Sequence, residues 1–271
     1  MSETRAAEPA ATEEPAVLYE LKDKVAIVTL NRPHRHNALD DASAILLGEL
    51  MDRARDDTEA RVTLLRGNGP SFCAGRDTAV LGKRVTGLSD FEHLSRSLRK
   101  KIGMLDSQKP IIAALHGHVI GGGFQNALKA DIRIAADDAK MRLPEIDWGI
   151  MSDGGATSLI AALAGPSRAK LLIMTGRSFS AREALEWGLV DIVVPRDRLD
   201  EEAMALARDI AAKPPMNVML AKQLVDALYG PAIRENLRNE MVALTAIYKS
   251  EDYQEARAAR AEKREASFKG R

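Results

Sequence analysis

The chain has 271 residues, and 45% of them are hydrophobic, which is enough for a substantial core in one large domain or two ordinary ones. Its 39 Lys and Arg residues balance 39 Asp and Glu residues, so it lacks the basic excess of nucleic-acid binders and the net charge of wholly disordered chains. The single cysteine, Cys73, excludes an intramolecular disulfide and a multi-cysteine metal site. No apolar run approaches the roughly 18–20 residues that cross a membrane. We therefore expect a protein that binds neither nucleic acid nor membrane.

Residues 1–16 consist mainly of Ala, Glu, Pro and Thr, with no aromatic side chain. Such a segment buries too little apolar surface to offset the entropy of ordering it, so we expect a disordered tail. It lacks the basic start and apolar centre of a secretion signal, and it carries the acidic residues that organelle transit peptides avoid. The expected location is therefore the cytoplasm.

Strand-like and helical patterns alternate over residues 17–195. Two β-branched runs around a short polar turn predict a β-hairpin, and apolar residues at helical spacing after Asp40, a good N-cap residue, predict a helix. The crossovers are long enough for parallel strands, which indicates an α/β core. The strands are expected at 17–21, 25–30, 61–65, 111–115 and 132–135, and the helices at 40–55, at 91–105 and before Lys129.

Residues 196–271 carry only helical patterns, at 197–212, 215–229, 231–248 and 251–265. Pro214-Pro215 and Gly230-Pro231 are expected to break them. The segment also holds more large apolar residues than a thin appendage needs to cover itself, among them Leu220, Leu224 and Leu228. We expect this helical C-terminal region to join copies of the chain into a trimer or hexamer.

Two glycine-rich turns are the strongest local signals for a site. Gly121, Gly122 and Gly123 follow an apolar strand and open a helix, where unpaired backbone N–H groups and the helix dipole favour a developing negative charge. A second turn lies at 72–77, and the two turns together could supply one N–H each to a shared oxyanion. The alternative is that the glycines only allow close packing between helix and strand.

Glu145 and Asp153 flank a segment that contains Trp148 and Met151 and few solubilising residues. Carboxyl groups in apolar surroundings have raised pKa values and serve as general acids or bases near neutral pH. Alternatively, Glu145 is simply an acid in the first turn of a helix that Pro144 opens.

Five segments, in order, resemble the enoyl-CoA hydratase/isomerase family, the crotonase superfamily, over about residues 17–271. The string FCAGRD at 72–77 is similar to the family's F-x-A-G-x-D loop, and residues 112–132 are similar to its central Gly-rich segment. The other matching segments are 31–39, 175–190 and 262–271.

The resemblance implies a spiral core of repeated ββα units, a helical region that mediates trimer or hexamer formation, and acyl-CoA thioester substrates with no separate cofactor. It places the two oxyanion N–H donors on Arg76 and Gly122. The residues that it implies for contact with coenzyme A are Arg35, Asn37, Ala38, Ala74, Asp77, Lys263 and Phe268.

The family's hydratases use two glutamates, and the resemblance matches the second to Glu145 and the first to Gln125. A glutamine orients a water by hydrogen bonding but does not take a proton from it, so water addition by the usual glutamate pair is in doubt. Moving a double bond needs one base, Glu145. The spacing to Asp153 also resembles the dienoyl-CoA isomerases, in which this residue is a second acid/base. We therefore expect a double-bond isomerase slightly ahead of a 2-enoyl-CoA hydratase.

A non-catalytic protein of the same fold, binding CoA or RNA, is the alternative from another class. The basic cluster Arg96, Arg99, Lys100 and Lys101 would favour RNA, but neighbouring acids and the absence of interleaved aromatics indicate a solvated helix face. The five histidines lack the spacing of a metal site, so we expect no metal.

Overall fold

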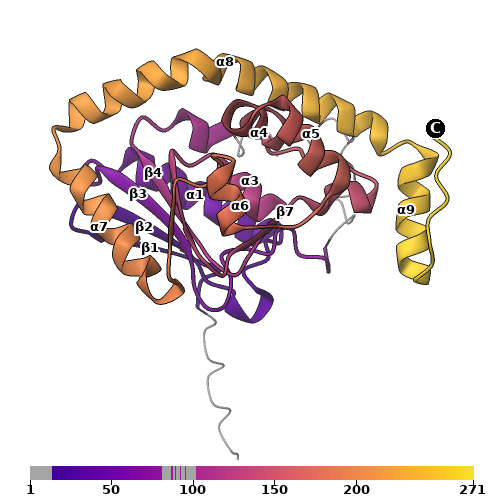
Figure 1. Cartoon of the computed structure of the whole chain (residues 1–271), viewed down its shortest axis with the longest axis horizontal. Helices are drawn as coiled ribbons and strands as arrows, with labels where there is room; N and C mark the ends of the chain where they lie inside the picture. Colours follow the sequence, from indigo (N-terminus) through magenta and orange to yellow (C-terminus); the bar gives the residue numbers. More distant parts are fainter. Residues whose placement is uncertain (1–13, 81–86, 88, 90–91, 93–94, 96–101) are drawn as a thin grey trace, which may run out of the picture.

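A computed structural model describes residues 14–80, 87, 89, 92, 95 and 102–271. Six strands form the larger sheet, in the order β1-β2-β3-β4-β6-β9, and only the β1–β2 hairpin is antiparallel. This arrangement confirms the expected α/β class and the parallel core (Figure 1). Its strands are β1 (Val17–Lys22), β2 (Val25–Leu30), β3 (Val62–Gly67), β4 (Ile111–Leu115), β6 (Ile132–Ala136) and β9 (Ile192–Val194).

A smaller sheet joins three strands of two or three residues each, namely β5 (His118–Ile120), β7 (Lys140–Arg142) and β8 (Phe179–Ser180). The chain alternates between the two sheets, since β4 and β6 enter the larger one and β5 and β7, which follow them, enter the smaller one. A helix or a 3-10 turn comes after each such pair, which is the repeated ββα spiral. The sequence gives no local signal for strands this short.

The α-helices in the described part of the chain lie around these sheets (Figure 1). They are α1 (Asp41–Asp56), α3 (Gly122–Leu128), α4 (Ala156–Ala164), α5 (Pro166–Thr175), α6 (Ala181–Glu186), α7 (Leu199–Ala212), α8 (Pro215–Ile247) and α9 (Glu251–Glu262). The 3-10 turns are η1 (Pro33–Arg35), η2 (Gly103–Asp106), η3 (Pro144–Trp148) and η4 (Arg196–Arg198). No helix in this part of the chain is long and apolar enough to span a membrane.

Each face of the larger sheet has its own core. Successive strand residues point to opposite faces, so Val25 and Ile27 pack with α7, while Ala26 and Val28 pack with α1 and α3 in the larger cluster. Asp40 caps α1 as expected, because its carboxylate accepts the Ser43 N–H over 2.8 Å. Most of the expected 91–105 helix, and all of the basic cluster at 96–101, fall outside the described residues.

The expected break at Gly230-Pro231 is wrong. Helix α8, which is 33 residues long, continues through these two residues and arches over the molecule (Figure 1). A proline inside a helix costs one hydrogen bond, and tertiary contacts offset this cost. One turn later, Arg234 donates to the Leu105 carbonyl over 2.9 Å and to the Asp106 carboxylate over 3.0 Å. Leu237, farther along, is fully buried against the core.

Candidate active site

The two glycine-rich turns lie side by side. The 72–77 loop runs parallel to β5, with the Cys73 N–H donating to the His118 carbonyl over 3.0 Å. On its other side it pairs with Leu39, whose N–H donates to Gly75 and whose carbonyl accepts from Asp77. In such a parallel bridge the N–H of the intervening residue, Arg76, points away from Leu39. We find no acceptor for that N–H among the described residues.

Gly75 lies where the 72–77 loop passes close to the start of α3. A Cβ on this residue would lie 3.4 Å from the Gly122 nitrogen and 2.7 Å from the Ile120 carbonyl oxygen, and its φ is +88°. Gly122 is the first residue of α3, so its N–H has no partner within the helix. The residue therefore carries a free donor next to the 72–77 loop.

Gly122 and Gly123, neighbours in the 121–123 run, differ in the space around them. A Cβ on Gly123 would lie 2.5 Å from the Cys73 carbonyl oxygen, so close packing accounts for this glycine. Nothing lies within 4 Å of a Cβ on Gly122, which leaves open space beside its N–H. Close packing therefore accounts for Gly123, whereas Gly122 has a free N–H beside open space.

Glu145 lies on η3 beside the start of α3. Its Oε1 would be 3.2 Å from a Cβ on Gly121, and it accepts a hydrogen bond of 2.6 Å from the Gln125 amide. Its Oε2 is buried, and no described residue bonds to it. The structure thus places Glu145, Gln125 and Gly122 together, with one buried carboxyl oxygen to which no described residue bonds.

Burial raises the pKa of Glu145 to about 7, and the negative charges of Asp153 and Glu240 add to this effect. The Gln125 hydrogen bond opposes it by favouring the carboxylate. A carboxyl with such a pKa is populated in both protonation states near neutral pH, as an acid/base requires. Asp153 is half-buried and near enough to act on Glu145 through its charge.

Gln125 is 4% exposed, and its amide contacts Glu145 on one side and Gly154 on the other. Its Nε2 donates to Glu145, and its Oε1 would be 2.0 Å from a Cβ on Gly154. Only glycine at this position leaves room for the amide.

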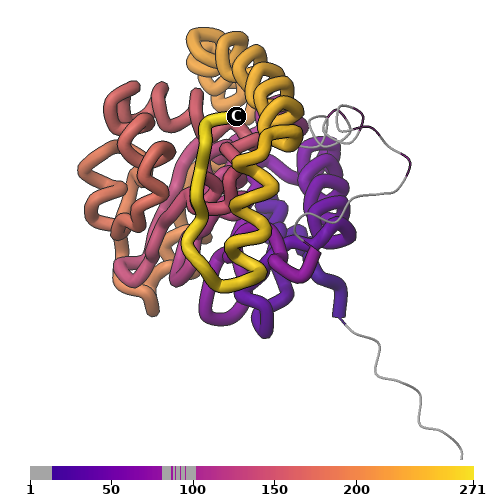
Figure 2. Tube along the Cα trace, turned by 90° about the vertical axis from the view of Figure 1, so that its right-hand side faces the viewer, coloured from indigo at the N-terminus to yellow at the C-terminus, as the bar shows by residue number. Residues whose placement is uncertain are grey.

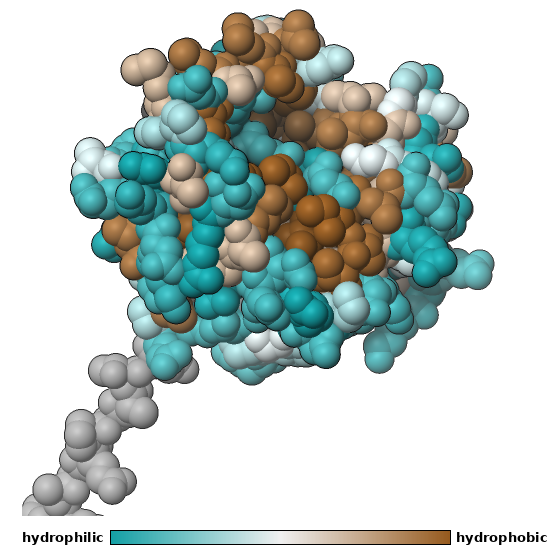
Figure 3. All heavy atoms as spheres, turned by 60° about the vertical axis from the view of Figure 1, so that its left-hand side comes forward, coloured by the Kyte–Doolittle hydropathy of each residue, from teal (hydrophilic) through white to brown (hydrophobic). Residues whose placement is uncertain are grey.

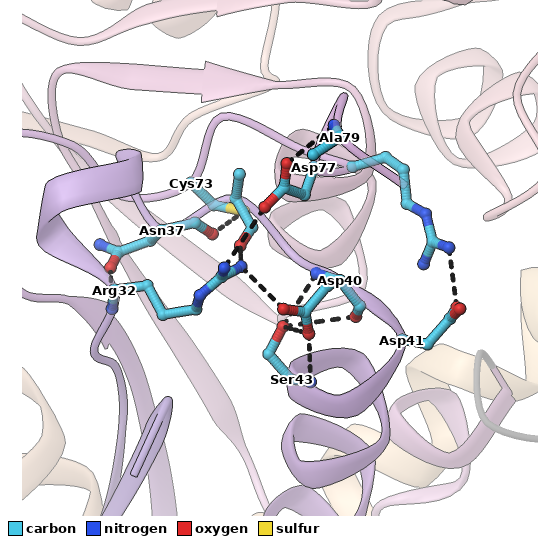
Figure 4. A network of polar contacts seen from close by, with 10 residues as sticks. Arg32, Asn37, Asp40, Asp41, Ser43, Cys73, Asp77 and Ala79 are labelled. Atoms are coloured by element: carbon cyan, nitrogen blue, oxygen red, sulfur yellow. Dashed lines mark hydrogen bonds and ion pairs between the residues drawn. The ribbon is translucent and has the colours of Figure 1, made fainter. Parts of the chain in front are cut away.

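Asn37 and Asp77 hold the expected coenzyme A loop together (Figure 4). The Asn37 amide, 1% exposed, donates to the Ser71 carbonyl over 2.7 Å and accepts the Arg32 N–H over 2.7 Å. Asp77 accepts from the Arg32 guanidinium over 3.3 Å. The Arg76 guanidinium pairs with Asp41 over 2.7 Å and is directed to the start of α1.

The other expected contacts with coenzyme A fall into two groups, one where the 35–38 segment meets Ala74 and one beyond α9. Arg35 is exposed on η1, Ala38 is buried and Ala74 is half-buried. Lys263 and Phe268 lie beyond α9, on a C-terminal segment that folds back along this helix (Figure 2). That segment is fixed by bonds of 2.6 and 2.7 Å from the Lys269 and Gly270 N–H groups to Asp252.

Glu240 of α8 is a buried carboxylate near the site that sequence analysis missed. It lies within a long charged helix and carries no motif, so no local signal distinguishes it. Among the described residues, no group of His, Cys, Asp and Glu side chains is arranged to hold a metal ion.

The sequence profile of the enoyl-CoA hydratase/isomerase family matches residues 20–271. A carnitinyl-CoA dehydratase of Salmonella enteritidis PT4 is 34% identical over 249 residues, which cover 90% of this chain and 94% of that protein. The solved carnitinyl-CoA hydratase from Mycobacterium avium is 31% identical, with a TM-score of 0.83, and the match covers 94% of this chain and 99% of that one.

A solved enoyl-CoA hydratase/isomerase from Pseudoalteromonas atlantica T6c is 28% identical, with a TM-score of 0.86 over 94% of this chain and all of that one. The profile match spans nearly the whole chain, and it includes the paired turns and the η3 segment. The chain therefore belongs to the enoyl-CoA hydratase/isomerase family, the crotonase superfamily.

Proposed function

We propose that this chain catalyses the reversible hydration of a 2-enoyl-CoA thioester, or equally the dehydration of a 3-hydroxyacyl-CoA, with Glu145 as the acid/base. One observation carries the proposal. The Glu145 carboxyl lies against Gly121, next to the free N–H of Gly122, with its Oε2 buried and unbonded within the described chain.

The N–H groups of Arg76 and Gly122 bind the thioester oxygen in this proposal. Negative charge develops on that oxygen when the α-carbon loses or gains a proton. Preorganised donors of this kind each lower the barrier by about 3–4 kcal/mol. Gly75 keeps the two donors close, because no other residue fits between the turns.

Dehydration then needs one ionisable group. The Glu145 carboxylate takes the α-proton and the electron pair of that C–H bond forms the enolate. As the C=C bond forms, the β-carbon–oxygen bond breaks and the proton on Glu145 passes to the departing hydroxyl, which leaves as water. Gln125, whose amide is anchored on Glu145, orients that water rather than ionising.

The relatives named carnitinyl-CoA dehydratase and hydratase support this reaction class over isomerisation. Double-bond isomerisation remains the second candidate, and Gln125 is the observation that favours it. An isomerase needs only Glu145 to move a proton along the enolate, and Asp153 serves as a second acid/base there.

A product analysis tests the proposal. Purified protein is incubated in D₂O with 2-enoyl-, 3-enoyl-, 3,5-dienoyl- and 3-hydroxyacyl-CoA, and the products are identified by mass spectrometry. Hydration predicts interconversion of the 2-enoyl and 3-hydroxyacyl thioesters. Migration of the 3-enoyl or dienoyl double bond without water addition supports the isomerase, and no conversion of any thioester contradicts both.

We also propose that residues 196–271 mediate assembly. The first half of α8 exposes Met216, Leu224 and Leu228 to 69%, 73% and 73%, respectively. Figure 3 shows apolar side chains gathered along the top of the molecule, where α8 runs in Figure 1. Such a face is covered in a trimer or hexamer.

A further inference from the structure

Glu240 reaches the site from α8, and the proposed chemistry does not use it. It is 2% exposed, although a buried carboxylate is costly unless it is hydrogen-bonded. Its two oxygens accept bonds from the Gly155 N–H over 2.8 Å, from the Thr157 N–H over 3.2 Å and from the Thr157 hydroxyl. Asn236, one turn earlier, donates to the same hydroxyl over 2.6 Å.

These bonds form the N-terminal cap of α4. The N-cap residue of this helix is Gly155, which has no side chain to accept the first N–H groups. A residue 85 positions away therefore performs a task that Ser, Asp or Asn performs locally in most helices. Leu237 also packs here, since its Cδ2 would lie 3.5 Å from a Cβ on Gly155.

The start of α4 in turn lies against the acid/base site. Gly154, which precedes the cap, has its backbone against the Gln125 amide, and the same amide donates to Glu145. Contact thus passes from Glu240 through the 154–155 backbone to Gln125 and then to Glu145.

We propose that Glu240 is a positioning residue that holds the Gly154 backbone against the Gln125 amide and thereby fixes the hydrogen bond from Gln125 to Glu145. The inference rests on the proposed function, because it takes Glu145 as the acid/base.

The charges around Glu145 give this role a measurable signature. Asp153, before α4, and Glu240, on α8, both raise the pKa of Glu145. The ion pair of Arg142, at the end of β7, and Asp147, on η3, is half-exposed, and Arg260 of α9 stacks on Trp148, 3.2 Å from the ring centroid. Removing Glu240 deletes one negative charge and admits water as the cap opens. Both changes favour the carboxylate, so the pKa of Glu145 falls.

Two variants separate the hydrogen bonds from the charge. Glu240→Ala removes both, whereas Glu240→Gln keeps an acceptor for the Gly155 N–H and removes only the charge. Asp131→Asn is the matched control, because half-buried Asp131 binds Lys222 of α8 and accepts the Ile111 N–H over 2.7 Å. This substitution weakens the anchoring of the same helix at a contact that does not involve Gln125 or Glu145.

The measurements are kcat, KM and a ¹³C NMR titration of the Glu145 carboxyl, assigned by its loss in Glu145→Gln. For Glu240→Ala we expect kcat to fall about tenfold or more with KM within about threefold, since a displaced catalytic group costs rate more than binding. The Glu145 titration moves to lower pH. Glu240→Gln gives a smaller downward shift, from the lost charge alone, with a smaller loss of kcat, and Asp131→Asn changes only the melting temperature.

A folded Glu240→Ala protein with unchanged kcat and a Glu145 titration shift no larger than that of Glu240→Gln overturns the proposal and leaves Glu240 with a structural role alone. If Glu240→Ala does not fold, Glu240→Gln decides, and a titration equal to that of Asp131→Asn overturns the proposal. The proposed function and the positioning role of Glu240 can be refuted independently. A wild-type protein that converts no thioester contradicts the proposed function, while a larger titration shift in Glu240→Ala than in Glu240→Gln still reports whether the Glu240 hydrogen bonds position the pair.

Discussion

The Gln125 amide donates to Glu145 Oε1 over 2.6 Å, so the two residues are one unit with a single ionisable group. The bond occupies one carboxyl oxygen and leaves Oε2, for which no described residue is a partner, as the atom that moves protons in our proposal.

Replacing Glu145 by Gln should abolish turnover and leave thioester binding nearly intact. Affinity in our proposal comes from the backbone donors and the coenzyme A loop, whereas general acid–base catalysis contributes about a hundredfold to ten-thousandfold in rate. Asp147→Asn is the control, since Asp147 is an exposed carboxylate on the same 3-10 turn, paired with Arg142. Steady-state kinetics and isothermal calorimetry check both variants. Full activity of Glu145→Gln would exclude this residue as the acid/base.

The same substitution should stabilise the fold above neutral pH. The pKa of Glu145 is raised from about 4.5 to about 7 by burial, so stability is present below pH 4.5 and is lost as the pH rises through 7 and the buried carboxyl ionises. Glu145→Gln removes this loss, which is worth about 1–3 kcal/mol at pH 8. Urea unfolding at pH 5 and pH 8 measures it. An equal difference between variant and wild type at both values contradicts the raised pKa.

Gln125→Glu should increase hydration of 2-enoyl-CoA relative to isomerisation. A glutamate there deprotonates the attacking water while Glu145 delivers a proton to the α-carbon. Two adjacent carboxyls raise each other's pKa, so the gain should appear only at higher pH, and a full pH profile is needed. If wild type already hydrates rapidly and the variant brings no gain at any pH, one carboxyl suffices and Gln125 acts by orienting water.

Gly75→Ala and Gly122→Ala form a matched pair. The first places a methyl 2.7 Å from the Ile120 carbonyl oxygen at φ +88°, so it should lower both the melting temperature and kcat by separating the two turns. The second meets nothing within 4 Å and should keep the wild-type melting temperature. Differential scanning calorimetry compares them, and equal melting temperatures would contradict the close approach of the turns.

A charge on the exposed face of α8 should break the assembly. We expect wild type to sediment as a trimer or hexamer and the double variant Leu224→Glu, Leu228→Glu to sediment as a monomer, because both side chains are 73% exposed within one chain. Leu21→Glu, at a 40% exposed position on β1, controls for the added charge. Wild type that sediments only as monomer at micromolar concentration contradicts the expectation.

Local patterns predicted much of the fold. The hairpin of β1 and β2, the Asp40 cap of α1 and the parallel strands β3, β4 and β6 were all indicated by periodicity or capping residues. Short strands such as β8, with two residues, have too few positions for a period of two to be visible. The continuity of α8 through Pro231 depends on contacts with distant segments, which outweigh a local penalty.

In the candidate site, too, some residues could be predicted from the sequence and others could not. Glu145, Gln125 and the two glycine turns lie within motifs, and their proximity required only that the motifs fold as implied. Glu240 could not be found, because its partners are more than 80 residues away and it has the sequence context of a solvated helix. A buried acid on a charged helix becomes visible only when the helix is docked.

The length of α8 has a thermodynamic consequence. At 1.5 Å per residue its 33 residues span about 50 Å, with the exposed apolar face near one end and the α4 cap toward the other. If subunits associate through that face, association restrains α8, which also holds residues 154–155 beside Gln125 and Glu145. By thermodynamic linkage, a thioester that orders residues 154–155 when it binds then also strengthens subunit association. Substrate would shift the subunit equilibrium without touching the interface.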